Sequence, residues 1–205
     1  MTLPPSDRPR LVINVGCGRR EHSKLPAHFD SWQQLRVDSD ASVEPDLIAD
    51  LTDMKTVADG TADAIWASHC LEHLYIHQVR AALKEFRRVL RDDGFVCVIV
   101  PDLQTVARYV SADQLHEPIY RSAAGPVTPH DMIYGYGAAI ADGRPTMAHH
   151  CGFTPGMLQH CFEQLPFGEV LLRRRAAQLE LAALARATPA KDAADRATLV
   201  AALEL

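Results

Sequence analysis

The residues that could do chemistry stand directly behind short apolar runs. The run Leu11–Val15 leads into Gly16, Cys17 and Gly18, and the next apolar run ends at Asp38 and Ser39. Glycines after a buried strand let a ligand approach the backbone, and an acidic residue after the next strand can accept hydrogen bonds from ribose hydroxyls. The pairing predicts a nucleoside site. A tight turn without a ligand and a solvated acidic turn are the alternatives.

The ligand expected at this turn carries no pyrophosphate. A dinucleotide site needs a third glycine at a helix N-terminus, but Arg19, Arg20 and Glu21 follow Gly18. An adenosyl ligand without phosphates fits better, which favours S-adenosylmethionine over NAD. An NAD-dependent oxidoreductase remains an alternative.

Histidines provide the candidate general bases. His69 follows the apolar run Ala64–Ala67, and His149 and His150 lie far along the chain. Histidine is the side chain best suited to proton transfer at neutral pH. We expect His69 to be the base, with His149 or His150 as the second candidate. A purely structural hydrogen-bonding role is the alternative for His69.

No metal site is expected. His69, His73 and His77 are spaced by four residues, which would align three imidazoles on a continuous helix. However, His69 falls at the end of a predicted strand, so this alignment fails. His149, His150 and Cys151 add further candidate ligands, but there is no Cys-x-x-Cys pair. Dispersed histidines without a metal are the favoured interpretation.

The elements that position these residues predict an α/β fold. Buried strands are expected at Leu11–Val15, Ala64–Ala67 and Phe95–Val100, with weaker ones at Leu35–Val37 and Asp46–Ala49. Apolar residues at helical spacing predict a helix over Ile76–Leu90, which the turn residues Asp92, Asp93 and Gly94 should end. Strand, helix and strand in this order predict a right-handed crossover in a doubly wound, mostly parallel, Rossmann-like sheet.

The remaining segments are expected to complete one domain over residues 1–205. Cys17–Gln34 lacks a clean helical stripe, so we expect a shortened first helix there. Residues 111–151 contain prolines and glycines and are too long for an ordinary loop, so they are expected to cover a site. Thr154 should cap a helix running to Leu165, a strand should follow at Glu169–Leu172, and residues 189–205 should form a C-terminal helix.

Composition limits the class of protein. The net charge of −5 and a pI near 6.0 argue against nucleic acid as a partner, and the apolar runs are too short for a membrane span. The first ten residues lack the apolar core of an export signal, so the five cysteines are expected to be reduced in a cytoplasmic protein. The C-terminal Ala/Leu segment is expected to pack on the core or on a second subunit, which would make a homodimer.

The ordered motifs resemble those of a known family. They are Val-Gly16-Cys-Gly18, Val-Asp38, Asp46-Leu-Ile-Ala-Asp50-Leu51, Ala67-Ser-His-Cys-Leu-Glu72-His73-Leu74, Glu85-Phe-Arg-Arg-Val-Leu90, Val100-Pro101-Asp102, Ile133-Tyr-Gly135 and His149-His-Cys-Gly-Phe-Thr154. From Leu11 to about Val170 the chain resembles the class I S-adenosylmethionine-dependent methyltransferases. Within that family, the closer resemblance is to a small bacterial branch whose members often accompany glycan and cell-surface biosynthesis.

The resemblance implies a role for each matching position. The methionine part of S-adenosylmethionine would lie against Gly16, Cys17 and Gly18, and the ribose would be held by Asp38. The adenine would contact Asp50 and Leu51. The sulfonium would lie beside Ser68 and His69. The reaction would be methyl transfer to a small-molecule acceptor, a sugar or related metabolite, with S-adenosylhomocysteine as product. Asn14 and Arg20 depart from the family pattern. A non-catalytic methyltransferase-like binding module is the main alternative.

Overall fold

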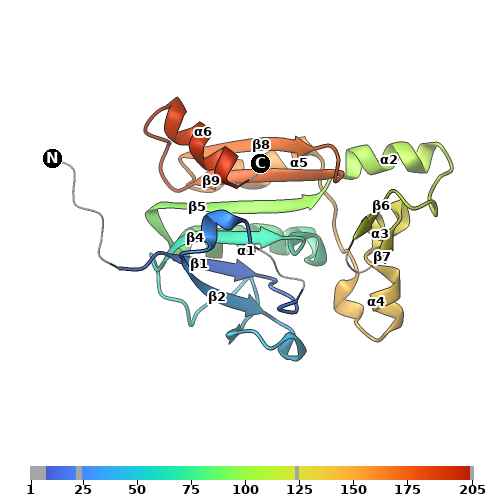
Figure 1. The fold of residues 1–205 in the computed structure, drawn as a ribbon, viewed down its shortest axis with the longest axis horizontal. Coiled ribbons are helices and arrows are strands. Elements are labelled where there is room, and N and C mark those ends of the chain that lie inside the picture. The colour runs from blue at the N-terminus through green and yellow to red at the C-terminus, as the bar shows by residue number, and fades with distance from the viewer. Residues whose placement is uncertain (1–7, 22–24, 123–124, 204–205) are drawn as a thin grey trace.

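The computed structural model describes residues 8–21, 25–122 and 125–203. A seven-stranded sheet in the order β3-β2-β1-β4-β5-β9-β8 forms its centre (Figure 1). The strands are β1 (Leu11–Val15), β2 (Gln33–Asp38), β3 (Leu47–Ile48), β4 (Ala62–Ser68), β5 (Leu90–Pro101), β8 (Glu169–Arg175) and β9 (Glu180–Arg186). β9 pairs antiparallel with both of its neighbours, whereas the pairs among β1 to β5 are parallel. The predicted mostly parallel sheet is confirmed.

Two apolar layers hold the sheet, one on each face. One layer packs alternate residues of the strands, such as Ile13 and Ile65, against Phe86 of α1 (Ile76–Val89) and Leu158 of α5 (Pro155–Glu163). The other layer is smaller and packs the remaining strand residues against Phe29 of η1 (Ala27–Phe29) and against α6 (Ala193–Ala202). Both layers follow from the alternation of side chains along a strand.

The predicted helix at Ile76–Leu90 is confirmed, but the predicted turn after it is wrong. The helix α1 ends at Val89, and β5 begins at the next residue, Leu90, which has an extended backbone. The pairing of β4 with β5 shifts register between Ala62 and Ala64, and this irregularity accommodates the polar residues after Leu90. Asp92, Asp93 and Gly94 therefore lie inside a long strand.

The connection from β1 to β2 contains little regular structure, which agrees with the prediction of a shortened first helix. Within the described part of this connection, the one helical element is the 3-10 helix η1; residues 22–24 lie outside the described chain. The next connection contains a second 3-10 helix, η2 (Ala41–Val43), which leads to β3. A third, η3 (Leu71–His73), follows β4 directly.

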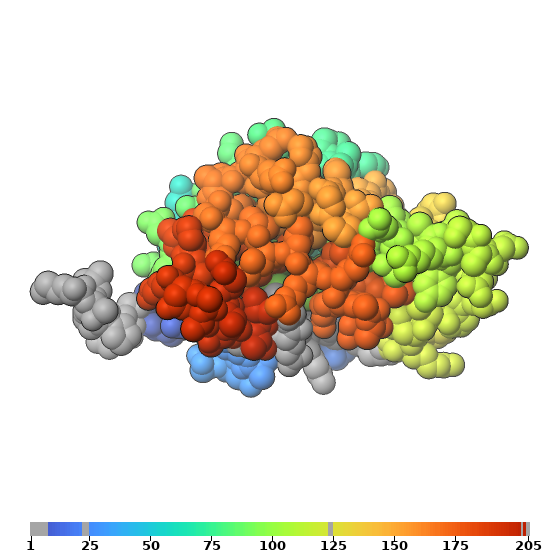
Figure 2. Space-filling view, turned by 90° about the horizontal axis from the view of Figure 1, so that it is seen from above, coloured from blue at the N-terminus to red at the C-terminus, as the bar shows by residue number. Residues whose placement is uncertain are grey.

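The predicted cover segment consists of short elements at the carboxyl end of the parallel strands (Figure 1). After α2 (Leu103–Ser111) come β6 (Tyr120–Ser122), β7 (Gly125–Val127), α3 (Pro129–Tyr134), α4 (Gly137–Ala141) and η4 (Pro145–Met147). Residues of α2, β6, β7 and α3 contribute to a separate apolar cluster around Val106, Met132 and Leu179. Figure 2 shows α2 and the residues after it, in yellow-green, as a lobe projecting at one end of the molecule.

The C-terminal part follows the sequence prediction closely. The Thr154 side chain accepts a hydrogen bond from the Met157 N–H and caps α5, and the expected strand is β8. Residues after α5, in orange and red, cover much of the face seen in Figure 2. Of the described helices, none is long and apolar enough to cross a lipid bilayer.

The packing of α1 gives a stability prediction. Phe86 is fully buried in the larger apolar layer, so Phe86→Ala leaves a cavity and should lower the free energy of unfolding by about 3–5 kcal/mol. Lys84→Ala, at an exposed position of the same helix, is the matched control and should change it by less than about 0.5 kcal/mol. Urea denaturation followed by circular dichroism measures both. Equal effects would contradict the assignment of this face as core.

Candidate active site

The two glycines after β1 are needed for different structural reasons. Both have positive φ, +60° at Gly16 and +57° at Gly18. A Cβ at Gly16 would lie 2.4 Å from the Cβ of Cys70, so this glycine allows the loop after β4 to pack against the turn. A Cβ at Gly18 would meet nothing within 4 Å among the described residues, so the space above Gly18 is open. Cys17 between them is buried.

Side chains from β2 hold the glycine turn in place. The Gly18 N–H donates to Asp38 Oδ2 at 2.9 Å, and the Asp40 N–H donates to Asp38 Oδ1 at 3.0 Å. The buried Arg36 guanidinium donates to the Gly18 carbonyl at 2.5 Å and to the Glu44 carbonyl at 2.6 Å. The structure thus brings Gly18 and Asp38 together as the sequence predicted.

The other predicted cofactor residues differ in exposure. Ser39 and Asp50 are exposed, and Asp50 Oδ1 accepts hydrogen bonds from the N–H and the hydroxyl of Thr52. The Leu51 side chain is buried in the larger apolar layer. Ser68 is the last residue of β4 and is half-buried.

His69 lies between two carboxylates. Its Nδ1 is 3.2 Å from Glu72 Oε1, and its Nε2 is 2.9 Å from Glu180 Oε1 at the start of β9. Burial opposes a charge on the imidazole, but the hydrogen bonds to Glu180 and Glu72 outweigh it and raise the pKa of His69 to about 10. An imidazolium with both nitrogens donating has no lone pair for a proton, although 42% of the side chain is accessible.

Glu72, in η3, is a buried carboxylate with only 1% of its surface exposed. Burial opposes its ionisation, but the hydrogen bond from His69 and the nearby histidines outweigh this and lower the pKa of Glu72. Its main-chain carbonyl accepts the N–H groups of His150 at 2.8 Å and Cys151 at 3.2 Å. Glu72 therefore joins the loop after β4 to the end of the cover segment.

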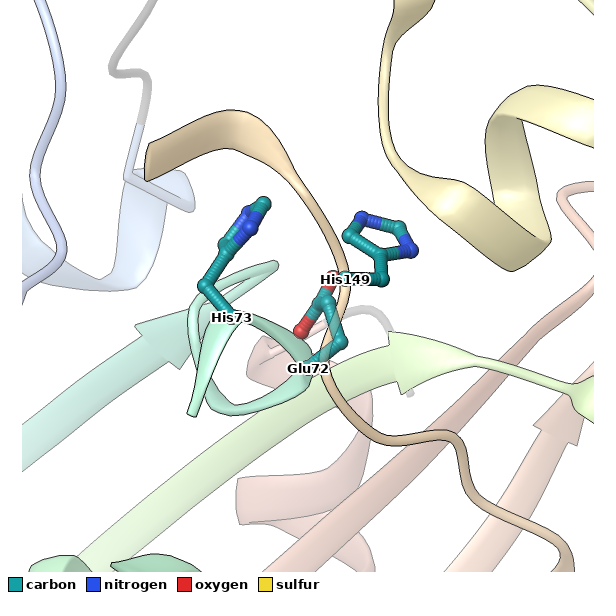
Figure 3. A group of neighbouring side chains, drawn as sticks. All are labelled: Glu72, His73 and His149. Atoms are coloured by element: carbon teal, nitrogen blue, oxygen red, sulfur yellow. The ribbon is translucent and has the colours of Figure 1, made fainter. Parts of the chain in front are cut away.

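Two more histidines stand beside Glu72 (Figure 3). The Nδ1 of His73 is 3.0 Å from the Ala148 carbonyl, and the Nδ1 of His149 is 3.0 Å from the Met132 carbonyl. Because a carbonyl oxygen only accepts, each Nδ1 is the protonated nitrogen, and in the neutral ring Nε2 keeps a lone pair. Burial lowers the pKa of His149, which favours this neutral form.

A cavity of about 210 Å³ opens next to these residues. Polar and apolar side chains line it together, with Glu72, Tyr134, His149 and His150 among Leu103, Met132 and Ile133. Such a mixture is typical of a small-molecule site. The cavity lies at the ends of β4 and β5 and under the cover segment. A second cavity, of about 290 Å³, is lined by Arg10, His28, Trp32 and Asp63 among others. Within the described chain, neither of these two cavities is lined by Gly16, Gly18 or Asp38.

Sequence reasoning missed three parts of this site. Glu180, the second partner of His69, is the first residue of a Leu/Ala-rich strand with no motif around it. Arg36 was missed although a charged residue inside an apolar run signals a partnered or functional side chain. The grouping of His149 with Glu72 and His73 depends on the fold of the cover segment, which no local pattern reveals.

Comparison with known proteins gives one family match and a set of similar folds. Residues 13–98 match the family model described as a methyltransferase domain. No curated protein sequence matches the chain.

Among solved structures, the fold is similar to a SAM-dependent methyltransferase from Archaeoglobus fulgidus (15% identity, TM-score 0.54, 86% of this chain and 85% of that one). It is also similar to one from Methanosarcina mazei (10% identity, TM-score 0.56, 87% and 93%). A third is the 1,6-didemethyltoxoflavin-N1-methyltransferase of Burkholderia thailandensis, solved with 1,6-didemethyltoxoflavin and S-adenosylhomocysteine bound (16% identity, TM-score 0.51, 89% and 72%).

The sheet order with its antiparallel β9 is therefore the class I methyltransferase fold. The family match covers residues 13–98, which include β2, β3, β4 and α1 of this fold.

The glycine turn gives a stability prediction that separates the two glycines. Gly16→Ala and Gly18→Ala both place a Cβ at positive φ, which costs about 1–2 kcal/mol. Only Gly16→Ala also forces a contact with Cys70, which adds about 1–3 kcal/mol. Thermal unfolding should therefore rank Gly16→Ala below Gly18→Ala. Equal losses would contradict the close packing of Gly16 against Cys70.

Proposed function

We propose that this protein is a methyltransferase that carries a methyl group from S-adenosylmethionine to an oxygen or nitrogen of a small-molecule acceptor, a sugar or glycan precursor. The observation that carries the proposal is the cavity between Glu72 and His149, at the carboxyl ends of β4 and β5. Ligands of open α/β sheets bind at this edge. The volume of about 210 Å³ favours a small acceptor, and the sugar class rests on family likeness.

The cofactor would lie over the ends of β1 and β2. The open space at Gly18 can receive the methionine part, with the backbone of Gly16 and Cys17 beside it. Among the described residues, each oxygen of Asp38 accepts one hydrogen bond, so about two of its four acceptor positions remain for ribose hydroxyls. Ser39, Asp50, the Leu51 backbone and Ser68 would complete the contacts. The solved neighbour from Burkholderia thailandensis, which holds S-adenosylhomocysteine, supports this cofactor.

The reaction asks mainly for alignment, because the sulfonium is already activated for in-line displacement. His69 would stand beside the sulfonium, but with both nitrogens engaged it is a positioning residue in this proposal. His149 takes the role of the base, because the lone pair left on its Nε2 can accept the proton of an acceptor hydroxyl.

Asp38→Asn tests the cofactor site. The loss of a charged acceptor should weaken S-adenosylhomocysteine binding by about 1–3 kcal/mol, roughly 5- to 150-fold. Asp53→Asn, at an exposed carboxylate paired with Lys55, is the matched control and should bind normally. Calorimetric titration measures both.

The same titration, run on the unmodified protein, separates the rival functions. Binding of S-adenosylmethionine and S-adenosylhomocysteine without NAD supports the proposal. A folded sample that binds none of the three is the non-catalytic module, and binding of NAD alone indicates an oxidoreductase.

His149→Ala tests the acceptor site. With methyl-labelled S-adenosylmethionine and a panel of sugars and nucleotide sugars, turnover should fall by about 10²–10⁴-fold while cofactor affinity is kept. His77→Ala, at an exposed position of α1, serves as control and should turn over normally. Labelling of amines or aromatic hydroxyls but no sugar would overturn the acceptor class.

A further inference from the structure

The strongest feature that the proposed function leaves unexplained is the arrangement of Glu72, His73 and His149. One ligand atom of each, a carboxylate oxygen or an imidazole nitrogen, lies within 4.8 Å of the other two (Figure 3). Two residues come from η3 and the third from the return of the cover segment. Two histidines and a carboxylate are a common ligand set for divalent transition metals.

The Glu72 carboxylate has one oxygen that nothing in the described chain satisfies. Oε1 accepts from His69, whereas Oε2 is buried and has no hydrogen-bond partner among the described residues. An ionised carboxylate oxygen left alone in the interior is costly, because its lost hydration is not replaced. A cation beside Oε2 would replace that hydration.

Both imidazoles are oriented as metal ligands usually are. A histidine that binds a metal commonly donates its other N–H to a backbone carbonyl, which fixes the ring and its tautomer. His73 makes this bond to Ala148 and His149 makes it to Met132, both at 3.0 Å. The ring centroids are 4.8 Å apart. The orientation leaves one Nε2 on each ring as the donor to a metal.

We propose that Glu72, His73 and His149 bind a divalent transition-metal ion, with Zn²⁺ as the reference ion. Tetrahedral zinc with nitrogen and oxygen ligands at about 2.0–2.2 Å needs ligand atoms about 3.3 Å apart, so binding draws the three groups together. Three protein ligands leave a coordination position open, as in catalytic zinc sites. Glu72 and His149 both line the 210 Å³ cavity, so a bound metal would lie beside the proposed acceptor site.

The role of the metal in methyl transfer rests on the proposed function, whereas metal binding itself does not. The acceptor hydroxyl oxygen would occupy the open position, and the metal would lower its pKa so that the proton leaves to water. The oxygen would then attack the methyl carbon of S-adenosylmethionine. The C–S bond breaks, its electron pair stays on sulfur, and S-adenosylhomocysteine leaves. In that case the Nε2 of His149 binds the metal and does not act as the base. The metal would then be the group that activates the acceptor.

The test is metal binding by the whole protein after removal of bound metal with a chelator. Calorimetry with Zn²⁺ and visible absorption with Co²⁺ should each show one equivalent bound, and the Co²⁺ spectrum should report nitrogen and oxygen ligands. His73→Ala and His149→Ala should each weaken Zn²⁺ binding by at least about 100-fold, because each removes one of three protein ligands. His77→Ala removes an exposed histidine close by in the sequence and is the matched control, which should keep wild-type affinity.

The outcomes separate this site from the proposed function. Absence of metal binding in a sample that still binds S-adenosylhomocysteine overturns the metal site and leaves His149 as the base. Metal binding that survives both His73→Ala and His149→Ala also overturns it. Metal binding lost in these two variants, in a protein that binds no adenosyl ligand, keeps the metal site and overturns the proposed function. Zn²⁺ binding by Glu72→Gln is a further test of the site, provided that circular dichroism shows the variant to be folded.

Discussion

The buried carboxylate of Glu72 is the constraint on which the rest of the site depends. Its side chain is 1% exposed and ionised, so the protein must supply the interactions that water would otherwise give. His69 meets one oxygen and is itself held by Glu180 of β9. The Glu72 carbonyl meanwhile accepts the N–H groups of His150 and Cys151. One residue thus joins β4, β9 and the cover segment.

The cofactor half of the edge is organised without a long helix after β1. In many α/β sheets a helix N-terminus stands behind the glycine turn and attracts phosphate. In the described part of the β1–β2 connection the helical element is η1, and the turn is held instead by Asp38 and the buried Arg36. These two side chains fix the Gly18 peptide from both its N–H and its carbonyl. Such a turn suits a ligand without a pyrophosphate, in agreement with the proposed cofactor S-adenosylmethionine.

The fold can be predicted from the sequence wherever burial produces a local pattern of apolar residues. The apolar runs at β1, β4 and β5 and the helical spacing in α1 are confirmed, because strands buried on both faces and an amphipathic helix each have a characteristic period. The turn expected at Asp92–Gly94 is wrong for a tertiary reason. Pairing with β4 and its irregularity at Ala62 and Ala64 extends β5 through polar residues, which overrides their turn preference.

The two halves of the site differ in the same way. Gly18 and Asp38 follow or end neighbouring strands, so the sequence pattern alone is enough to predict that they meet. The grouping of Glu72, His73 and His149 leaves no such pattern, because His149 lies far along the chain. His69, His73 and His77 do not share one helix, because η3 separates β4 from α1.

His149 joins Glu72 only because the cover segment returns to β5, where Asp102 pairs with Phe153. The β-strand ends therefore determine the proposed cofactor site, whereas the path of the cover segment determines the proposed acceptor site. The family match covers residues 13–98 and does not reach the cover segment. The acceptor must therefore be inferred from the chemistry of Glu72, His73 and His149.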